Sequence, residues 1–141
     1  QGFFSITDIA SLTNGSKLPV VLPMAPLDGY FHYPFLELGE GMSESIVRAK
    51  GRGAVATWSA TGYATGRGHQ QLDRGFFDTL FKEDNRVLGE AAMAGKLRLA
   101  ATDSNLDLID TYTLFGDPAL LIHGLWEGEA IYLPVMQRSA R

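Results

Sequence analysis

The alternation of short apolar runs with amphipathic segments predicts an α/β chain. Two runs rich in β-branched and small apolar residues, 18–22 and 54–58, are bounded by turn-forming residues and fit buried parallel strands. A third run, 119–122, follows a Gly-Asp-Pro turn at 116–118 and is predicted to be another strand of the same sheet. Because helical segments separate these runs, we expect a mainly parallel sheet with helices on both faces.

Capping residues and a periodicity of 3.6 residues predict the helices between these strands. The helical segments are 7–12, with Thr7 as N-cap; 43–51, with Ser43 as N-cap; 66–85; 86–102; and 106–112. In the third segment, Leu72, Phe76 and Leu80 recur on one helical face, which predicts packing against the core. The glycines of the fourth segment permit close helix packing, at a cost to helicity of about 1 kcal/mol each.

Composition and charge exclude several classes of function. The 141 residues fit one domain, and a hydrophobic content of 45% supports a core. A net charge of −4 argues against a nucleic acid as the main partner. No stretch approaches the roughly 20 apolar residues of a membrane helix, and residues 1–15 lack the pattern of a signal peptide. The absence of cysteine excludes disulfides, a thiolate metal site and a cysteine nucleophile within this chain.

Motifs for catalysis or metal binding are sparse. The histidines His32, His69 and His123 lie far apart and lack the spacing of metal ligands one helical turn apart, so no metal site is predicted. Asp28 precedes a glycine and Asp117 precedes a proline, so turn formation is the favoured interpretation for both. A role as acid or base is the alternative.

Five segments follow one another in a characteristic order. They are "LTNGSKLPVVLPMAPLDGYFHYP", "SESIVRAKGRGAVATWSATG", "RGHQQLDRGFFDTLF", "VLGEAAMAGK" and "DTYTLFGDPALLI". In this order they resemble the C-terminal half of the gingipain-type cysteine peptidases, which have a caspase-like fold. The resemblance implies a three-layer α/β/α domain, of which residues 1–125 form the C-terminal half. Residues 126–141 are predicted to form a tail with an edge strand, because Pro134 cannot donate to an inner ladder.

The loop after the first strand bears on catalysis. In the family, the matching loop carries the nucleophilic cysteine in a Thr-Cys pair, and the catalytic histidine lies upstream of this strand. Here the pair is Ala25-Pro26, with Ala25 at the nucleophile position if the register slips by one, and no histidine precedes residue 18. Neither side chain can attack a carbonyl, and Pro26 lacks the amide N–H that helps to hold an oxyanion. We therefore expect no catalysis, also when the chain is joined to an upstream half.

The resemblance also implies a substrate pocket at the carboxyl ends of the strands, where ligands gather in open α/β sheets. The candidate pocket residues are Trp58, Ser59, Thr61, Asp28 and Tyr30. Trp58 fits a core aromatic equally well. Tyr30, with Phe31 and Tyr33, flanks this crevice or packs under the loop.

Three functions are consistent with these features. The first is a pseudo-peptidase, or a processed subunit, that keeps a peptide-binding groove. The second is a structural subunit of an extracellular array or filament, with the terminal edge strand as docking element. The third is an active hydrolase that uses Ser59 and His69. Partners are expected to be the upstream half of the same precursor or neighbouring copies, and a peptide. No cofactor is expected, although calcium stays open, and the resemblance implies an extracellular or cell-surface location. The start at Gln1 rather than Met indicates processing or an upstream part.

Overall fold

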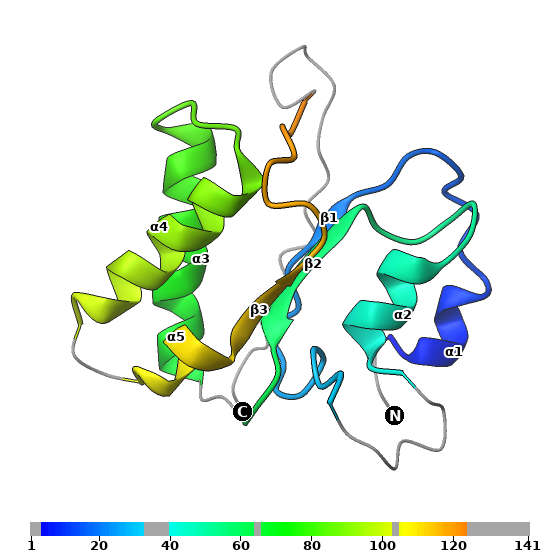
Figure 1. The fold of residues 1–141 in the computed structure, drawn as a ribbon, viewed down its shortest axis with the longest axis horizontal. Coiled ribbons are helices and arrows are strands. Elements are labelled where there is room, and N and C mark those ends of the chain that lie inside the picture. The colour runs from blue at the N-terminus through cyan, green and yellow to red at the C-terminus, as the bar shows by residue number, and fades with distance from the viewer. Residues whose placement is uncertain (1–3, 33–39, 64–65, 103–104, 124–141) are drawn as a thin grey trace, which may run out of the picture.

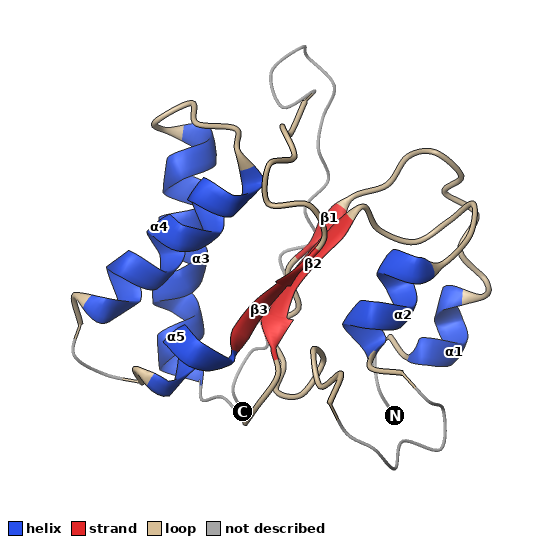
Figure 2. Ribbon diagram, in the orientation of Figure 1, coloured by secondary structure: helices blue, strands red, loops and turns tan. Residues whose placement is uncertain are grey.

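The computed structural model describes residues 4–32, 40–63, 66–102 and 105–123 and shows a small sheet between two groups of helices (Figure 1). In chain order the elements are α1 (Ile6–Ile9), β1 (Val20–Val21), α2 (Met42–Arg48), β2 (Ala56–Ala60), α3 (Gly66–Phe81), α4 (Leu88–Ala100), α5 (Asp107–Thr111) and β3 (Tyr112–Phe115). Helix α2, with α1 outside it, covers one face of the sheet, and α3, α4 and α5 lie on the other (Figure 2). The predicted three-layer α/β/α arrangement is confirmed.

The sheet has the strand order β1-β2-β3. Strands β1 and β2 run parallel, as predicted, with Val20 opposite Ala56. Strand β3 runs antiparallel to β2, with Leu114 opposite Trp58. In the described part of the chain the sheet is therefore mixed rather than mainly parallel.

The prediction of a strand at 119–122 is wrong. The third strand occupies 112–115, directly after α5, where Tyr, Thr, Leu and Phe favour an extended backbone. The strand is followed by Gly116, whose φ of 139° is a backbone conformation that residues other than glycine rarely adopt. Residues 119–122 instead run beside the start of α4, where the Leu88 N–H donates to the Leu120 carbonyl at 3.0 Å.

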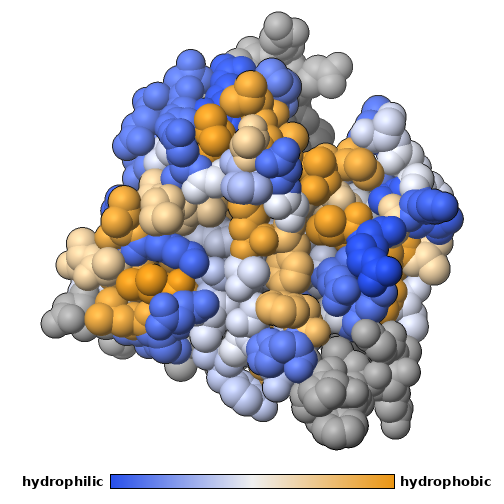
Figure 3. Space-filling view, viewed as in Figure 1, coloured by the Kyte–Doolittle hydropathy of each residue, from blue (hydrophilic) through white to orange (hydrophobic). Residues whose placement is uncertain are grey.

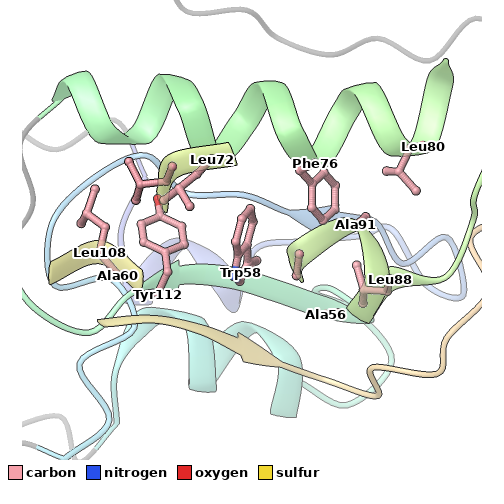
Figure 4. Packing of buried hydrophobic residues seen from close by; sticks show 12 residues of the cluster. Ala56, Trp58, Ala60, Leu72, Phe76, Leu80, Leu88, Ala91, Leu108 and Tyr112 are labelled. Carbon is pink, nitrogen blue, oxygen red and sulfur yellow. The ribbon is translucent and has the colours of Figure 1, made fainter. Parts of the chain in front are cut away.

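Strand β2 is buried over its whole length and supplies the centre of the core. The Trp58 indole stacks on Phe76 of α3, with ring centroids 5.4 Å apart, and meets Tyr112 of β3 edge-on at 5.1 Å (Figure 4). Leu72 and Leu80 lie on the same face of α3 as Phe76 and are buried with it. The helix face predicted from the periodicity is therefore the one that packs on the sheet.

Helices α3 and α4 approach each other at two glycines. A Cβ atom on Gly75 would lie 2.6 Å from the Cα of Gly95. A Cβ atom on Gly95 would lie 2.5 Å from Cη2 of Trp58 and 2.7 Å from the carbonyl oxygen of Leu72. Glycine is needed at these positions because the neighbouring backbone and the indole fill the space of a side chain.

Gly95→Ala should therefore destabilise the domain by about 1–3 kcal/mol, although alanine is the better helix former by about 1 kcal/mol. The added methyl group overlaps Trp58 in a packed core. Urea denaturation followed by circular dichroism measures the free energy of unfolding. Leu97→Ala, at a 65% exposed position of the same helix, is the control and should change stability by about 0.5 kcal/mol or less. A gain in stability for Gly95→Ala would contradict the close packing.

Two helices begin at other residues than predicted. Helix α1 starts after Ser5 rather than Thr7, because the Ser5 N–H donates to the Asp8 carboxylate at 2.8 Å in a capping-box arrangement. Helix α2 starts after Gly41, so that Ser43 lies inside the first turn instead of capping it. Both differences are confined to the helix ends, where local hydrogen bonds decide the first residue.

Some predictions concern parts of the chain that the structure does not describe. The edge strand predicted within 126–141 and Tyr33 lie outside the described residues, and the boundary between 125 and 126 stays a prediction. Within the described ranges, every helix is too short or too polar to cross a membrane.

Candidate functional site

The strand-end loop, residues 22–32, follows β1 and turns back along the end of β2. The Leu27 N–H donates to the Gly62 carbonyl at 3.2 Å, and the Gly29 N–H donates to the Ala60 carbonyl at 2.9 Å. These two bonds tie the second half of the loop to the carboxyl end of the central strand.

The tip of the strand-end loop is formed by Ala25 and Pro26, which are both exposed. The next residue, Leu27, has a φ of 67°, in the left-handed region that residues other than glycine seldom occupy. Such conformations cost about 1 kcal/mol or more and persist only where the surroundings impose them. Gly29 is needed for a different reason, since a Cβ there would lie 2.6 Å from Ser59 Oγ. The loop is therefore held in a defined shape with position 26 at its tip.

A cleft of about 850 Å³ opens beside this loop. Its walls come from the start of α1, the strand-end loop, the start of α2, the turn after β2 and the end of α5. The lining residues are Phe4, Ser5, Ile6, Leu27, Asp28, Tyr30, His32, Glu40, Gly41, Met42, Thr61, Gly62, Tyr63 and Thr111. Because β1 and β2 are parallel, their carboxyl ends meet at this edge of the sheet, which is where ligands bind in open α/β folds.

Asp28 gives the cleft a half-buried carboxylate. Burial raises the pKa of Asp28 above its usual value, and the carboxylate has no ion-pair partner among the described residues. The other carboxylate in the cleft, that of Glu40, is already paired with Arg48 of α2. No group of three or more His, Asp or Glu side chains in the described ranges is arranged to hold a metal ion. Asp28 is therefore the acidic group that is available to a cationic ligand.

The predicted pocket residues divide between the cleft and the interior. Asp28, Tyr30 and Thr61 line the cleft. Ser59 is fully buried under the loop, where its Oγ is hydrogen-bonded at 2.7 Å to a serine hydroxyl of α2. Trp58 is also fully buried, on the opposite face of β2, so it is a core residue of the described structure and does not line the cleft.

The geometry excludes Ser59 and His69 as a nucleophile and its base. Ser59 faces α2, whereas His69 of α3 packs edge-on against Tyr112 with ring centroids 5.5 Å apart. Tyr112 lies opposite Ala60, whose side chain points to the α3 face of the sheet. The sheet therefore separates the two side chains, and the active hydrolase that depends on this pair has no structural basis.

Three aromatic residues of the cleft were missed by the sequence analysis. Tyr63 is 81% exposed and follows closely after β2, so an aromatic residue just after a predicted strand was the available signal. His32 meets Tyr30 edge-on, with ring centroids 4.3 Å apart. Phe4 comes from the start of the described chain, and no local pattern connects it with the strand-end loop.

A second hollow lies between α4 and β3, and apolar side chains are exposed around α4 and α5 (Figure 3). The hollow measures about 160 Å³ and is lined mainly by apolar side chains, together with Lys96. The exposed apolar residues include Met93 and Leu97 of α4 and Leu106, the residue before α5. The hollow lacks the several convergent polar groups that mark a ligand site, so we place the candidate site at the larger cleft.

The layered sheet and the strand-end loop beside a cleft define an α/β fold with its candidate site at the carboxyl ends of the parallel strands. The family model of Peptidase family C25 matches residues 1–123. The chain belongs to this family, and the resemblance to the gingipain-type peptidases is confirmed.

Known relatives show how much of such a protein this chain represents. It is 27% identical over 128 residues to gingipain R2 of Porphyromonas gingivalis strain ATCC BAA-308 / W83, covering 86% of this chain and 17% of the relative. It is 26% identical to gingipain R1 of Porphyromonas gingivalis, covering 86% of this chain and 13% of that relative. The chain therefore spans less than a fifth of these proteins.

Two solved structures are similar in fold. The crystal structure of the Arg-specific cysteine proteinase gingipain R matches with a TM-score of 0.70 and 25% identity, covering 84% of this chain and 29% of that one. The complex of the pro- and mature domains of Porphyromonas gingivalis RgpB matches with a TM-score of 0.75 and 26% identity, covering 84% and 30%. This coverage confirms that the chain is part of a gingipain-like peptidase domain.

Proposed function

We propose that this part of a C25 peptidase domain binds a basic side chain of a peptide in the cleft and does not cleave the peptide. One juxtaposition carries the proposal. The half-buried carboxylate of Asp28, which has no ion-pair partner among the described residues, lies two positions after a loop tip, Ala25-Pro26, that bears no nucleophile.

The absence of catalysis is inferred from the chemistry of the loop tip. A peptidase of this type needs a thiolate and a base that also protonates the leaving amine. The methyl group of Ala25 and the ring of Pro26 offer no nucleophilic atom, and Pro26 has no N–H to donate to an oxyanion. His32 lines the cleft, but a base without a nucleophile cannot form an acyl-enzyme.

The walls of the cleft favour a cation next to Asp28. Tyr30 and Tyr63 both line it, and aromatic faces attract guanidinium and ammonium groups. A half-buried carboxylate gains a charge-assisted hydrogen bond when such a group binds. That a solved relative is described as Arg specific supports a ligand of the same charge.

We further propose that this chain acts together with the upstream half of its domain. Strand β1 has a single hydrogen-bonded neighbour among the described residues, which leaves one edge to pair with a further strand. A solved relative is itself a complex of pro- and mature domains, which supports a partner domain. On the basis of family membership we place the protein outside the cell or at its surface.

Peptide binding tests the proposed function. A labelled peptide with a central arginine should bind and stay intact, whereas the same peptide with neutral citrulline should bind about tenfold more weakly, because it cannot pair with a carboxylate. Asp28→Asn should weaken binding of the arginine peptide about tenfold and remove the preference. Asp84→Asn, at an exposed aspartate between α3 and α4, is the matched control. Fluorescence anisotropy measures the affinities, and mass spectrometry detects any cleavage.

The affinity for the arginine peptide should depend on pH. Asp28 must be ionised to pair with arginine, and because burial raises its pKa, it takes up a proton at a higher pH than an ordinary aspartate. The affinity should be complete above this pKa and should fall as the pH drops through it, and Asp28→Asn should abolish this fall. Equal affinity for arginine and citrulline would contradict the proposed ligand, and turnover of the peptide would contradict the absence of catalysis.

A further inference from the structure

We propose that Tyr112 is a positioning residue that fixes the first half of the strand-end loop from the core side. Its phenol O–H donates to the Pro23 carbonyl at 3.1 Å, between residues that are 89 positions apart in the sequence. The same hydroxyl lies 3.4 Å from Sδ of Met24. Tyr112 is 1% exposed, and its ring is held against Trp58 and points toward α3 (Figure 4).

The loop needs such an anchor because its first half is poor in backbone donors. Pro23 and Pro26 have no N–H, so this part of the loop can be tied mainly through carbonyl groups and side chains. The second half is tied to β2 by the N–H groups of Leu27 and Gly29. The bond from Tyr112 therefore supplies the second fixed point, and the exposed tip lies between the two. Because the left-handed backbone of Leu27 is unfavourable, the loop is expected to relax when one of these two attachments is lost.

The surroundings of Tyr112 keep it a hydrogen-bond donor. Burial raises the pKa of Tyr112, and the carboxylates of Asp73 and Asp28 raise it further, so the phenol keeps its proton. His69 packs on the ring edge-on, and its burial lowers its pKa, an effect that the backbone of Met24 partly offsets. Nε2 of His69 has no hydrogen-bond partner in the described part of the chain. His69 also contacts the first half of the loop through the Met24 backbone, while the phenol proton is donated to the Pro23 carbonyl at 3.1 Å.

Tyr112 acts on the cleft only through the loop. Its side chain does not line the cleft, whereas Leu27 and Asp28, shortly after the anchored proline, do. The effect of Tyr112 on peptide affinity rests on the proposed function. The anchoring of the loop does not, and it can be measured without any ligand.

Tyr112→Phe tests the anchor, because it removes the hydroxyl and keeps the ring in the core. Hydrogen exchange of the complete protein that carries this chain should show about fivefold faster exchange at the Leu27 and Gly29 amides, as expected when one hydrogen bond holding a local structure is lost. Exchange in the middle of α4 should stay unchanged. If the proposed function also holds, the affinity for the arginine peptide should fall about threefold to tenfold.

Thr79→Val is the matched control. Thr79 is 4% exposed and donates its hydroxyl to the Glu83 carboxylate at 3.2 Å, toward the end of α3 that is remote from His69. The Thr79→Val variant also loses one buried hydroxyl, but hydrogen exchange at the Leu27 and Gly29 amides should not change. Unchanged exchange in Tyr112→Phe, or an equal increase in Thr79→Val, would overturn the proposal. Faster loop exchange in a protein that binds no arginine peptide would support the anchor and refute the proposed function alone.

Discussion

Trp58→Ala should lower the free energy of unfolding by about 3–5 kcal/mol, which is a large part of the stability of an ordinary domain. Trp58 has no exposed surface, and its indole contacts α3, β3 and the glycine of α4 that makes room for it. Truncation leaves a cavity bordered by three elements that cannot all move inward together. Urea denaturation followed by circular dichroism measures the effect.

Two further variants separate a role in the core from a role in ligand binding. Trp58→Phe keeps an aromatic ring and should cost less than Trp58→Ala. Tyr63→Ala removes an aromatic that is 81% exposed in the cleft and should change stability by about 0.5 kcal/mol or less. If Trp58→Ala were as stable as the unchanged protein and affected peptide affinity alone, Trp58 would be a pocket residue, and the core described here would be wrong.

The parts of the fold that could be predicted are those with a local signal. A helix that buries one face must repeat its apolar residues with the helical period, and Leu72, Phe76 and Leu80 do so. The third strand has no signal that singles it out, because 112–115 and 119–122 are both short apolar runs that fit a strand. Pairing with β2 decides between them, and this is a property of the tertiary structure. The aromatic and β-branched residues of 112–115 favoured a strand, but the preceding helical pattern runs directly into them.

The candidate site could be predicted only where it is continuous in sequence. Asp28 and Tyr30 directly follow a recognisable strand, so the position of the loop was enough to find them. Phe4 and Tyr63 come to the cleft through the packing of other segments. The two faces of β2 differ in sequence, because apolar Ala56, Trp58 and Ala60 alternate with polar Thr57 and Ser59, and the apolar set packs in the core. Trp58 and Thr61 were both pocket candidates because they lie near the strand end, but this alternation places them on opposite faces, and only Thr61 reaches the cleft.

The double variant Ala25→Thr with Pro26→Cys should react with a thiol-directed peptidyl inhibitor, whereas the unchanged protein should not. The strand-end loop already presents position 26 at its exposed tip next to the cleft, so the substitution restores both a thiol and a backbone N–H at that point. The rate of labelling should rise by about 10²–10⁴-fold when the upstream half supplies a histidine, because a thiol of ordinary pKa is a weak nucleophile without a neighbouring base. Mass spectrometry of the adduct over time gives this rate with and without the upstream half.

Ala100→Cys is the control for this experiment, since it places a thiol at an exposed position at the end of α4, outside the cleft. It should be labelled slowly, and the upstream half should not accelerate the reaction. Equal rates for Ala100→Cys and the double variant would mean that the loop offers nothing beyond an exposed thiol, so position 26 would not be the nucleophile position. Ala25→Thr alone should give no adduct, because the chain then contains no thiol. An adduct on any residue of the unchanged protein, together with turnover of a peptide, would show that this domain catalyses with a different nucleophile and would end the proposal that it only binds.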